Sequence, residues 1–265
     1  MQIATEIPIS ALTELSALTD YDFVIGPVYR RFKEYADFYK KQNALGRYVI
    51  LDNGAFEGEL LEDEDLLDIA QELQPAEVVA PDVLYDRKAT LDRVKGFLGK
   101  FKLLEGAADI KIQVCPCGQT TEEYVQSYAN LVEVADVVGL TYLTFLEPQS
   151  PVMGLSHFGA ESKRLSVLHT LVGRGLIDSN IPHHLLGLAN LDALKHYAGM
   201  YPWIRSIDTS FPIAAAMEGR ALGLYGRGRE AKPSARMNYE HRLTSAEFAH
   251  ASHNIQWMRN QCSTA

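Results

Sequence analysis

The chain contains the stretch Tyr48-Val49-Ile50-Leu51-Asp52-Asn53-Gly54-Ala55-Phe56-Glu57. Its first four residues form a short apolar run that includes two β-branched side chains, and Asn53-Gly54 is a common turn dipeptide. A run that is apolar without alternation is typical of a strand buried on both faces in a parallel sheet. The stretch therefore predicts a buried strand that ends in an acidic residue, Asp52.

The same pattern recurs along the chain. Besides 48–51, candidate strands lie at 23–26, 77–80, 110–114, 136–140, 183–187 and 204–207. Helical spacing of apolar residues appears between them at 65–73, 122–134, 162–172 and 191–198. This alternation predicts an α/β fold, a single-domain (β/α)8 barrel over residues 1–265. An eighth strand is not evident, and a doubly wound open sheet is the alternative. No G-x-G-x-x-G follows the first predicted strand, which disfavours a dinucleotide-binding domain of that kind.

Composition sets the broad class of the protein. Residues are 47% hydrophobic and the net charge is −9, with no apolar run of the roughly 18 residues that a membrane helix needs. The first residues do not resemble a secretory signal, and three cysteines do not suggest a disulfide framework. We expect a protein of the cytoplasm, or of the host cytoplasm if viral, without membrane association. The acidic balance disfavours wide coating of nucleic acid, but leaves room for one local basic patch.

Three of the predicted strands run into an aspartate, namely Asp52, Asp82 and Asp208. In a parallel barrel the carboxyl ends of all strands open on one face, so these side chains are expected to converge there. Carboxylates at one mouth can attack a sugar anomeric carbon, transfer protons, and accept hydrogen bonds from a ligand. An aspartate after a strand also commonly caps a helix or turns the chain, which is the alternative for each of them.

Six segments, in the same order along the chain, resemble the tRNA-guanine transglycosylase superfamily. They are Leu51-Asp52-Asn53-Gly54-Ala55-Phe56-Glu57, Val79-Ala80-Pro81-Asp82, Val138-Gly139-Leu140-Thr141, Leu186-Gly187-Leu188-Ala189, Ile207-Asp208-Thr209-Ser210-Phe211-Pro212 and Ser252-His253-Asn254-Ile255. The resemblance implies a TIM-type barrel that replaces guanine in a nucleic acid through a covalent glycosyl-enzyme.

The chain departs from the tRNA enzymes at their zinc site. Those enzymes carry Cys-x-Cys-x2-Cys and His after the nucleophile, whereas no cysteine lies here between Asp208 and Cys262. Cys115 and Cys117 lie on the fourth predicted strand and are not equivalent; we expect free thiols there and no metal. A barrel without the zinc module looks like the phage-type 7-deazaguanine DNA transglycosylases, which exchange guanine in DNA for a 7-deazaguanine base and so protect viral DNA from restriction.

The resemblance implies a role for individual residues. Asp208 would be the nucleophile at C1′ and Asp52 the general base that takes the proton from N9 of the entering base, while Asp82 would read the guanine edge. Phe56 and Leu186 would sandwich the base. The remaining substrate-binding positions are Asn53, Gly139, Leu140 and Gly187. The family's glutamine after the fourth strand has no clear counterpart, since the alignment reaches Cys115, Cys117 or Gln119. No cofactor is implied.

A basic loop segment is expected at about 213–242, followed by a closing helix at 245–260. Basic residues in the loop could hold the phosphates on both sides of a flipped nucleotide: Arg220, Arg227, Arg229, Lys232 and Arg236. The expected partners are DNA, guanine and a 7-deazaguanine base (7-cyano-7-deazaguanine or a derivative), and a homodimer is left open. The alternatives are a tRNA-guanine transglycosylase, a barrel enzyme acting on a small nucleoside-like molecule, and a non-catalytic nucleobase-binding barrel.

Overall fold

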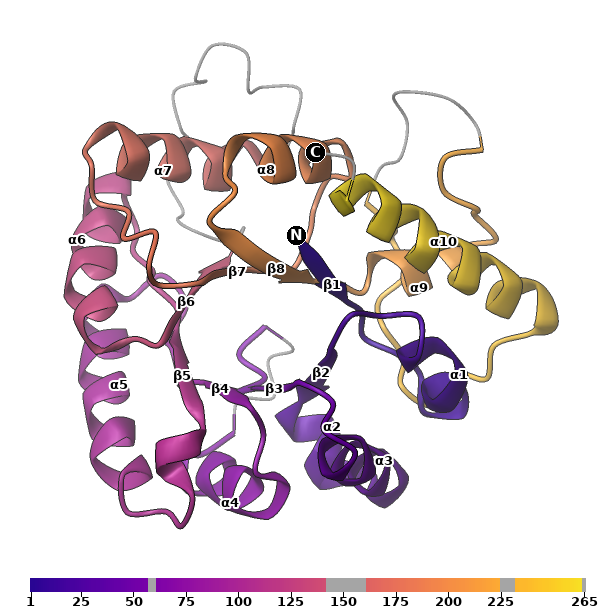
Figure 1. Cartoon of the computed structure of the whole chain (residues 1–265), viewed down its shortest axis with the longest axis horizontal. Helices are drawn as coiled ribbons and strands as arrows, with labels where there is room; N and C mark the ends of the chain where they lie inside the picture. Colours follow the sequence, from indigo (N-terminus) through magenta and orange to yellow (C-terminus); the bar gives the residue numbers. More distant parts are fainter. Residues whose placement is uncertain (57–60, 142–160, 225–231, 264–265) are drawn as a thin grey trace.

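A computed structural model describes residues 1–56, 61–141, 161–224 and 232–263 of the chain. Its strands run parallel in the order β1-β8-β7-β6-β5-β4-β3-β2 and form an inner ring surrounded by helices (Figure 1). The strands are β1 Gln2–Ala4, β2 Asp22–Ile25, β3 Val49–Asp52, β4 Glu77–Val79, β5 Lys111–Val114, β6 Val137–Thr141, β7 His183–Leu186 and β8 Ile204–Asp208. The (β/α)8 barrel is thereby confirmed, and the open doubly wound sheet is wrong.

Most of the helices lie between successive strands. They are α1 Leu12–Ser16, α2 Gly26–Arg31, α3 Lys33–Ala44, α4 Asp63–Leu73, α5 Arg87–Phe101, α6 Thr121–Leu131, α7 Glu161–Gly173 and α8 Asp192–Met200. Two further helices, α9 Phe211–Met217 and α10 Ser245–Ser263, follow β8. Short 3₁₀ turns cover Ile9–Ala11, Ala107–Asp109 and Val132–Val134. Thr120 caps the start of α6, since its hydroxyl accepts a hydrogen bond from the Glu123 amide at 3.1 Å.

Burial explains why these short runs become strands. All residues of β2, β3 and β4 are buried, because one face fills the barrel and the other packs against the outer helices. The seven strands predicted from apolar runs are confirmed. The unidentified strand is β1, which has only three residues and begins with an exposed glutamine. The equally short β4 contains two valines, whereas Gln2-Ile3-Ala4 has one large apolar residue and so forms no apolar run that could reveal it.

The ring is held at the β1–β2 junction by Asp20. The Ile3 amide donates to the Asp20 carboxylate at 2.9 Å, and the Asp20 amide donates to the Ile3 carbonyl at 2.9 Å. On its other side, β1 pairs with β8 so that Ala4 lies opposite Asp208. The strand that sequence patterns missed therefore completes the barrel beside the predicted nucleophile.

Helix α10 confirms the closing helix expected at 245–260 and continues to Ser263. It packs on α9. Because α9 extends to Met217, the segment at 213–242 that was expected to be a loop begins as helix. The fully buried Asn254 of α10 ties the two together. Its amide nitrogen donates to the carbonyls of Pro212 (2.9 Å) and Arg220 (3.0 Å), and its oxygen accepts from the Leu222 amide at 2.7 Å. The Asn254 found by resemblance is thus a structural anchor.

Among the described residues, no helix combines the length and apolarity that crossing a bilayer requires.

Replacing Asn254 by alanine tests this anchor. The change leaves two carbonyls and one amide without partners in a buried site, so we expect the free energy of unfolding to fall by about 2–4 kcal/mol. Urea unfolding followed by tryptophan fluorescence measures the loss. The matched control is Gln256→Ala, an exposed amide two positions along the same helix, which should change stability little. Equal effects of the two substitutions would contradict the assignment.

Candidate active site

The register of the barrel places the predicted acids at one rim. Asp52 is the last residue of β3 and Asp208 the last residue of β8. Asp52 lies opposite Ile25 of β2, and Asp208 lies opposite Ala4 of β1. Because every pairing is parallel, these strand ends open on the same face of the ring. The expected convergence of Asp52 and Asp208 is found.

Both carboxylates line a cavity at this rim, which we call the inner pocket. It has a volume of about 80 Å³, and its walls include Glu6, Asp52, Phe56, Leu186, Gly187, Asp208 and Lys232. A larger hollow of about 540 Å³, the outer cleft, shares Glu6, Phe56 and Lys232 with it. The two spaces are therefore contiguous. Phe56, which is 60% exposed, stands where they meet.

Asp208 is buried and faces two hydrogen-bond donors. Nε2 of His184 lies 3.0 Å from its Oδ1, and the Gly187 amide donates to the same oxygen at 3.3 Å. Burial lowers the pKa of His184 to about 3, so its ring is neutral. Nδ1 of His184 lies 2.9 Å from the Ser206 hydroxyl, which itself accepts from Arg205 Nε at 3.1 Å. A neutral ring that accepts at Nδ1 carries its proton on Nε2 and donates to Asp208.

Burial raises the pKa of Asp208 to about 7, opposed by the Gly187 amide and the charge of Arg164. The pKa of Asp52 rises further, to about 8. Burial is again the main cause, opposed by a 2.9 Å hydrogen bond from the Gly54 amide, and the nearby carboxyls of Asp208, Asp82 and Glu6 add to it. Burial thus raises the pKa of both carboxyls, and Asp208 receives hydrogen bonds from two donors, whereas the Gly54 amide donates to Asp52. Two buried carboxyls with different hydrogen-bond donors suit a division into an acid and a nucleophile.

Glu6 is a member of the site that sequence patterns missed. It follows β1, lines both the inner pocket and the outer cleft, and accepts a 2.5 Å hydrogen bond from the Tyr239 hydroxyl. Burial raises its pKa to about 7, with the charge of Asp208 acting in the same direction and that of Lys232 opposing it. Glu6 could have been predicted as a site residue only by recognising β1 as a strand, because Glu6 follows the end of that strand.

Asp82 and Asn53 form a buried pair behind Asp52. The Asn53 amide nitrogen donates to Asp82 Oδ1 at 2.9 Å and to the Ala80 carbonyl at 3.0 Å. Burial is the main cause that raises the pKa of Asp82. Among the described residues, the walls of the inner pocket do not include either side chain. The structure thus brings Asp82 next to the pocket rather than into its wall.

Gly139 lies at a close approach inside the barrel. A Cβ atom there would come within 2.7 Å of Gln113, 2.8 Å of Cys115 and 2.9 Å of Leu186, so a larger residue would force these side chains to move. The adjoining Leu140 is buried, and its carbonyl accepts a 2.9 Å hydrogen bond from Arg164. The amide group of Gln113 is buried without a hydrogen-bond partner among the described residues. This polar group beside Gly139 was not predicted.

The predicted phosphate-binding residues divide into three groups. Lys232 and Arg236 line the outer cleft together with Arg31 of α2, which was not predicted. Arg220 instead forms a 3.0 Å ion pair with Glu218. Arg227 and Arg229 lie outside the described residues.

Cys115 and Cys117, which follow β5, are free and buried. Burial raises the pKa of Cys117 to about 11, and its sulfur lies 3.0 Å from the Thr90 hydroxyl. In the part of the chain that the structure describes, no group of three or more His, Cys, Asp or Glu side chains is arranged to hold a metal ion.

Comparison of the chain with models of known protein families and with curated proteins finds no match.

The raised pKa of Asp52 makes stability depend on pH. Because its pKa in the folded protein, about 8, exceeds the usual value near 4, its contribution is fully present below about pH 4 and is lost as the pH rises to 8. Asp52→Asn removes this loss. We expect the variant to gain stability over the parent chain by up to about 1.4 kcal/mol per pH unit between pH 5 and 8.

Urea unfolding at several pH values measures this difference in free energy of unfolding between the variant and the parent chain, which we call the stability gap. The control is Asp37→Asn, whose exposed carboxyl has a lowered pKa because Lys33 donates a hydrogen bond to it. That contribution is lost only as the pH falls below the usual range, so the control gap should stay constant from pH 5 to 8. A constant gap for Asp52→Asn as well would show that Asp52 is not a buried, protonated carboxyl.

Proposed function

We propose that the protein is a base-exchange glycosyltransferase that replaces guanine in DNA by a 7-deazaguanine base. The observation that carries the proposal is the pair of buried carboxyls, Asp52 and Asp208, that line one pocket and receive hydrogen bonds from different donors. Retaining exchange at an anomeric carbon needs one carboxylate as nucleophile and a second carboxyl for proton transfer. The family resemblance assigns these roles to the same two residues.

In the first step Asp208 attacks C1′ of a deoxyguanosine. The C1′–N9 bond breaks and its electron pair goes to the departing guanine, which takes the proton held by Asp52. The Nε2–H of His184 and the amide of Gly187 favour the ionised form of Asp208, so that it can act as the nucleophile. The product is an ester between Asp208 and the sugar, with the DNA backbone intact.

In the second step a 7-deazaguanine base enters the inner pocket. Its N9 attacks C1′ while the N9 proton goes to Asp52, and the bond between C1′ and the Asp208 oxygen breaks. Both carboxyls return to their initial states. Two inversions at one carbon restore the original configuration, and no cofactor takes part.

Recognition of the base rests on residues around this pocket. Phe56 and Leu186 both line it and supply the apolar surfaces between which a base would lie. Asp82, adjacent to the pocket, is proposed to accept hydrogen bonds from N1–H and the exocyclic amine of guanine. The Asn53 contact already satisfies one oxygen of Asp82, which leaves the other for the ligand.

DNA is the proposed polymer because this chain, unlike the tRNA enzymes that it resembles, has no zinc-site cysteines after Asp208. The base must leave the duplex to reach a buried pocket. Arg31, Lys232 and Arg236 line the outer cleft next to that pocket, where phosphates flanking a flipped nucleotide would lie. Protection of viral DNA from restriction is the biological role that this exchange would serve.

Incubation with a labelled 7-deazaguanine base and duplex DNA, single-stranded DNA or tRNA tests the proposal. We expect label to enter DNA, and Asp208→Asn to lower the exchange rate by roughly 10⁴-fold or more because an amide cannot form the ester. Asp109→Asn, in the 3₁₀ turn before β5, is the matched control and should retain activity. Label in tRNA alone would replace DNA by tRNA, and label in no polymer would favour a small-molecule substrate.

The outer cleft can be tested separately through the salt dependence of DNA binding. If Lys232 contacts a phosphate, Lys232→Ala should reduce the slope of log K against log[salt] by about 0.9. Fluorescence anisotropy with a labelled duplex between 50 and 200 mM salt measures the slope. Lys102→Ala, an exposed lysine after α5, is the control and should leave it unchanged. An unaltered slope for Lys232→Ala would remove this residue from the DNA-binding surface.

A further inference from the structure

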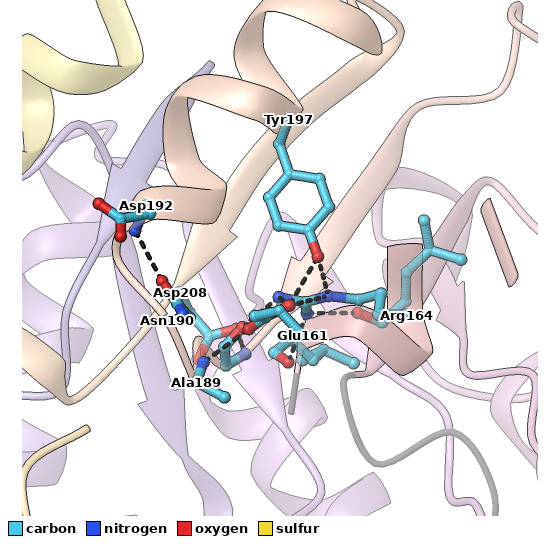
Figure 2. A network of polar contacts seen from close by, with 10 residues as sticks. Glu161, Arg164, Ala189, Asn190, Asp192, Tyr197 and Asp208 are labelled. Atoms are coloured by element: carbon cyan, nitrogen blue, oxygen red, sulfur yellow. Dashed lines mark hydrogen bonds and ion pairs between the residues drawn. The ribbon is translucent and has the colours of Figure 1, made fainter. Parts of the chain in front are cut away.

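Arg164, on α7, is a fully buried arginine held by a full set of partners. Its guanidinium forms a 2.8 Å ion pair with Glu161, one turn earlier on the same helix, and its Nε lies 3.1 Å from the Tyr197 hydroxyl. Tyr197 in turn donates to Glu161 at 2.6 Å. Figure 2 shows the Tyr197 ring reaching from α8 onto the Glu161–Arg164 pair. A buried charge is costly unless it is paired and hydrogen-bonded, and this one is both.

The remaining donors of Arg164 hold the ends of two strands. Nη1 donates to the carbonyls of Leu140 on β6 (2.9 Å) and Leu186 on β7 (3.1 Å), and Nη2 donates to the Gly187 carbonyl (3.0 Å). Leu186 and Gly187 belong to the wall of the inner pocket. One side chain on an outer helix thus joins neighbouring strands at the rim where the site lies.

Gly187 connects this network to Asp208. Its φ of +67° lies in the left-handed region that favours glycine, and this turn directs its amide toward Asp208 Oδ1 at 3.3 Å. Arg164 holds the carbonyl of the same residue, and Glu161 Oε1 accepts from the Ala189 amide two residues later at 2.6 Å. The ion pair therefore holds the 187–189 turn on both sides. Asp208 lies next to this turn in Figure 2.

We propose that Arg164, with Glu161 as its counter-ion, is a positioning residue: it fixes the 187–189 turn so that the Gly187 amide faces the Asp208 carboxylate, and its charge favours the ionised carboxylate. That the ionised carboxylate is the nucleophile rests on the proposed function. The geometry of the turn and the charges of Arg164 and Glu161 are independent of the proposed function.

The charges around Asp208 show why this cation matters. The negative charge of Asp208 raises the pKa of three acidic neighbours: Tyr21 before β2, Glu6 after β1 and Asp52 on β3. His184 on β7 is neutral and helps only as a hydrogen-bond donor. The charge of Arg164 lowers the pKa of Asp208 against the effect of burial.

The two partners of the ion pair should have opposite effects on Asp208. Arg164→Met removes the positive charge, so the pKa of Asp208 should rise and less carboxylate should be present at neutral pH. Glu161→Gln keeps an oxygen that can accept from the Ala189 amide but removes the negative charge that offsets Arg164, so the pKa of Asp208 should fall. A purely structural pair predicts the same direction for both, because either change loosens the same turn.

Carbon-13 NMR of protein labelled at the aspartate carboxyl carbons measures these titrations without substrate. The Asp208 signal is assigned by its loss in Asp208→Asn. We expect Arg164→Met to move the titration of Asp208 upward by about one pH unit and Glu161→Gln to move it downward. Arg174→Gln, which removes an exposed ion pair with Glu122 just after the same helix, is the control and should leave it in place.

Shifts in one direction, or none in the folded variants, would overturn the proposal. If Arg164→Met does not fold, Glu161→Gln decides alone: a lowered pKa of Asp208 supports the positioning role and an unchanged one overturns it. Arg164→Lys adds a further readout, since it keeps the charge but lacks the donors for three carbonyls. It should restore the pKa of Asp208 while the kcat of base exchange stays reduced. Absence of exchange in the parent chain would instead count against the proposed function alone.

Discussion

The parallel hydrogen-bonded ladder of the barrel forces all strand ends of one kind onto a single rim. This rim is enclosed by side chains from several strands, so the carboxyls of Asp52, Asp208 and Glu6 share a space that is poor in water. Charged groups are destabilised there, and their proton affinities rise. The chemistry proposed for the protein depends on this constraint, because the same carboxyls on an open surface would be fully ionised and equivalent.

The fold also limits how far burial raises the pKa of Asp208, the proposed nucleophile. Asp208 is given donors by neighbouring elements: a neutral His184 from β7 and the Gly187 amide after it. Asp52 has one backbone donor, Gly54. Arg164 acts through the Gly187 turn and through its charge, which makes an outer helix part of the site. The difference between two chemically identical side chains thus arises from what surrounds each of them.

A barrel of this kind supports many reactions, so the fold does not identify the function. The support lies in the site: two buried carboxyls at one pocket, apolar walls from Phe56 and Leu186, and cations that line the outer cleft. The acidic balance of the whole chain is compatible with this arrangement. A nucleic acid would meet a local basic cleft rather than a uniformly basic surface.

The sequence by itself determined seven strands, most of the long helices and two converging aspartates, because buried parallel strands read as apolar runs that end in polar residues. It did not reveal β1, because Gln2-Ile3-Ala4 forms no apolar run, and with it Glu6 was missed. The roles of Arg164 and Gln113 were also hidden, since a lone arginine in a helix and a glutamine in a strand carry no local signal of what they will face. Their partners lie tens of residues away, for example Leu140, Leu186 and Tyr197 for Arg164. Only the barrel brings such groups into contact, and the donors and charges that it places beside each buried carboxyl decide how firmly that carboxyl holds its proton.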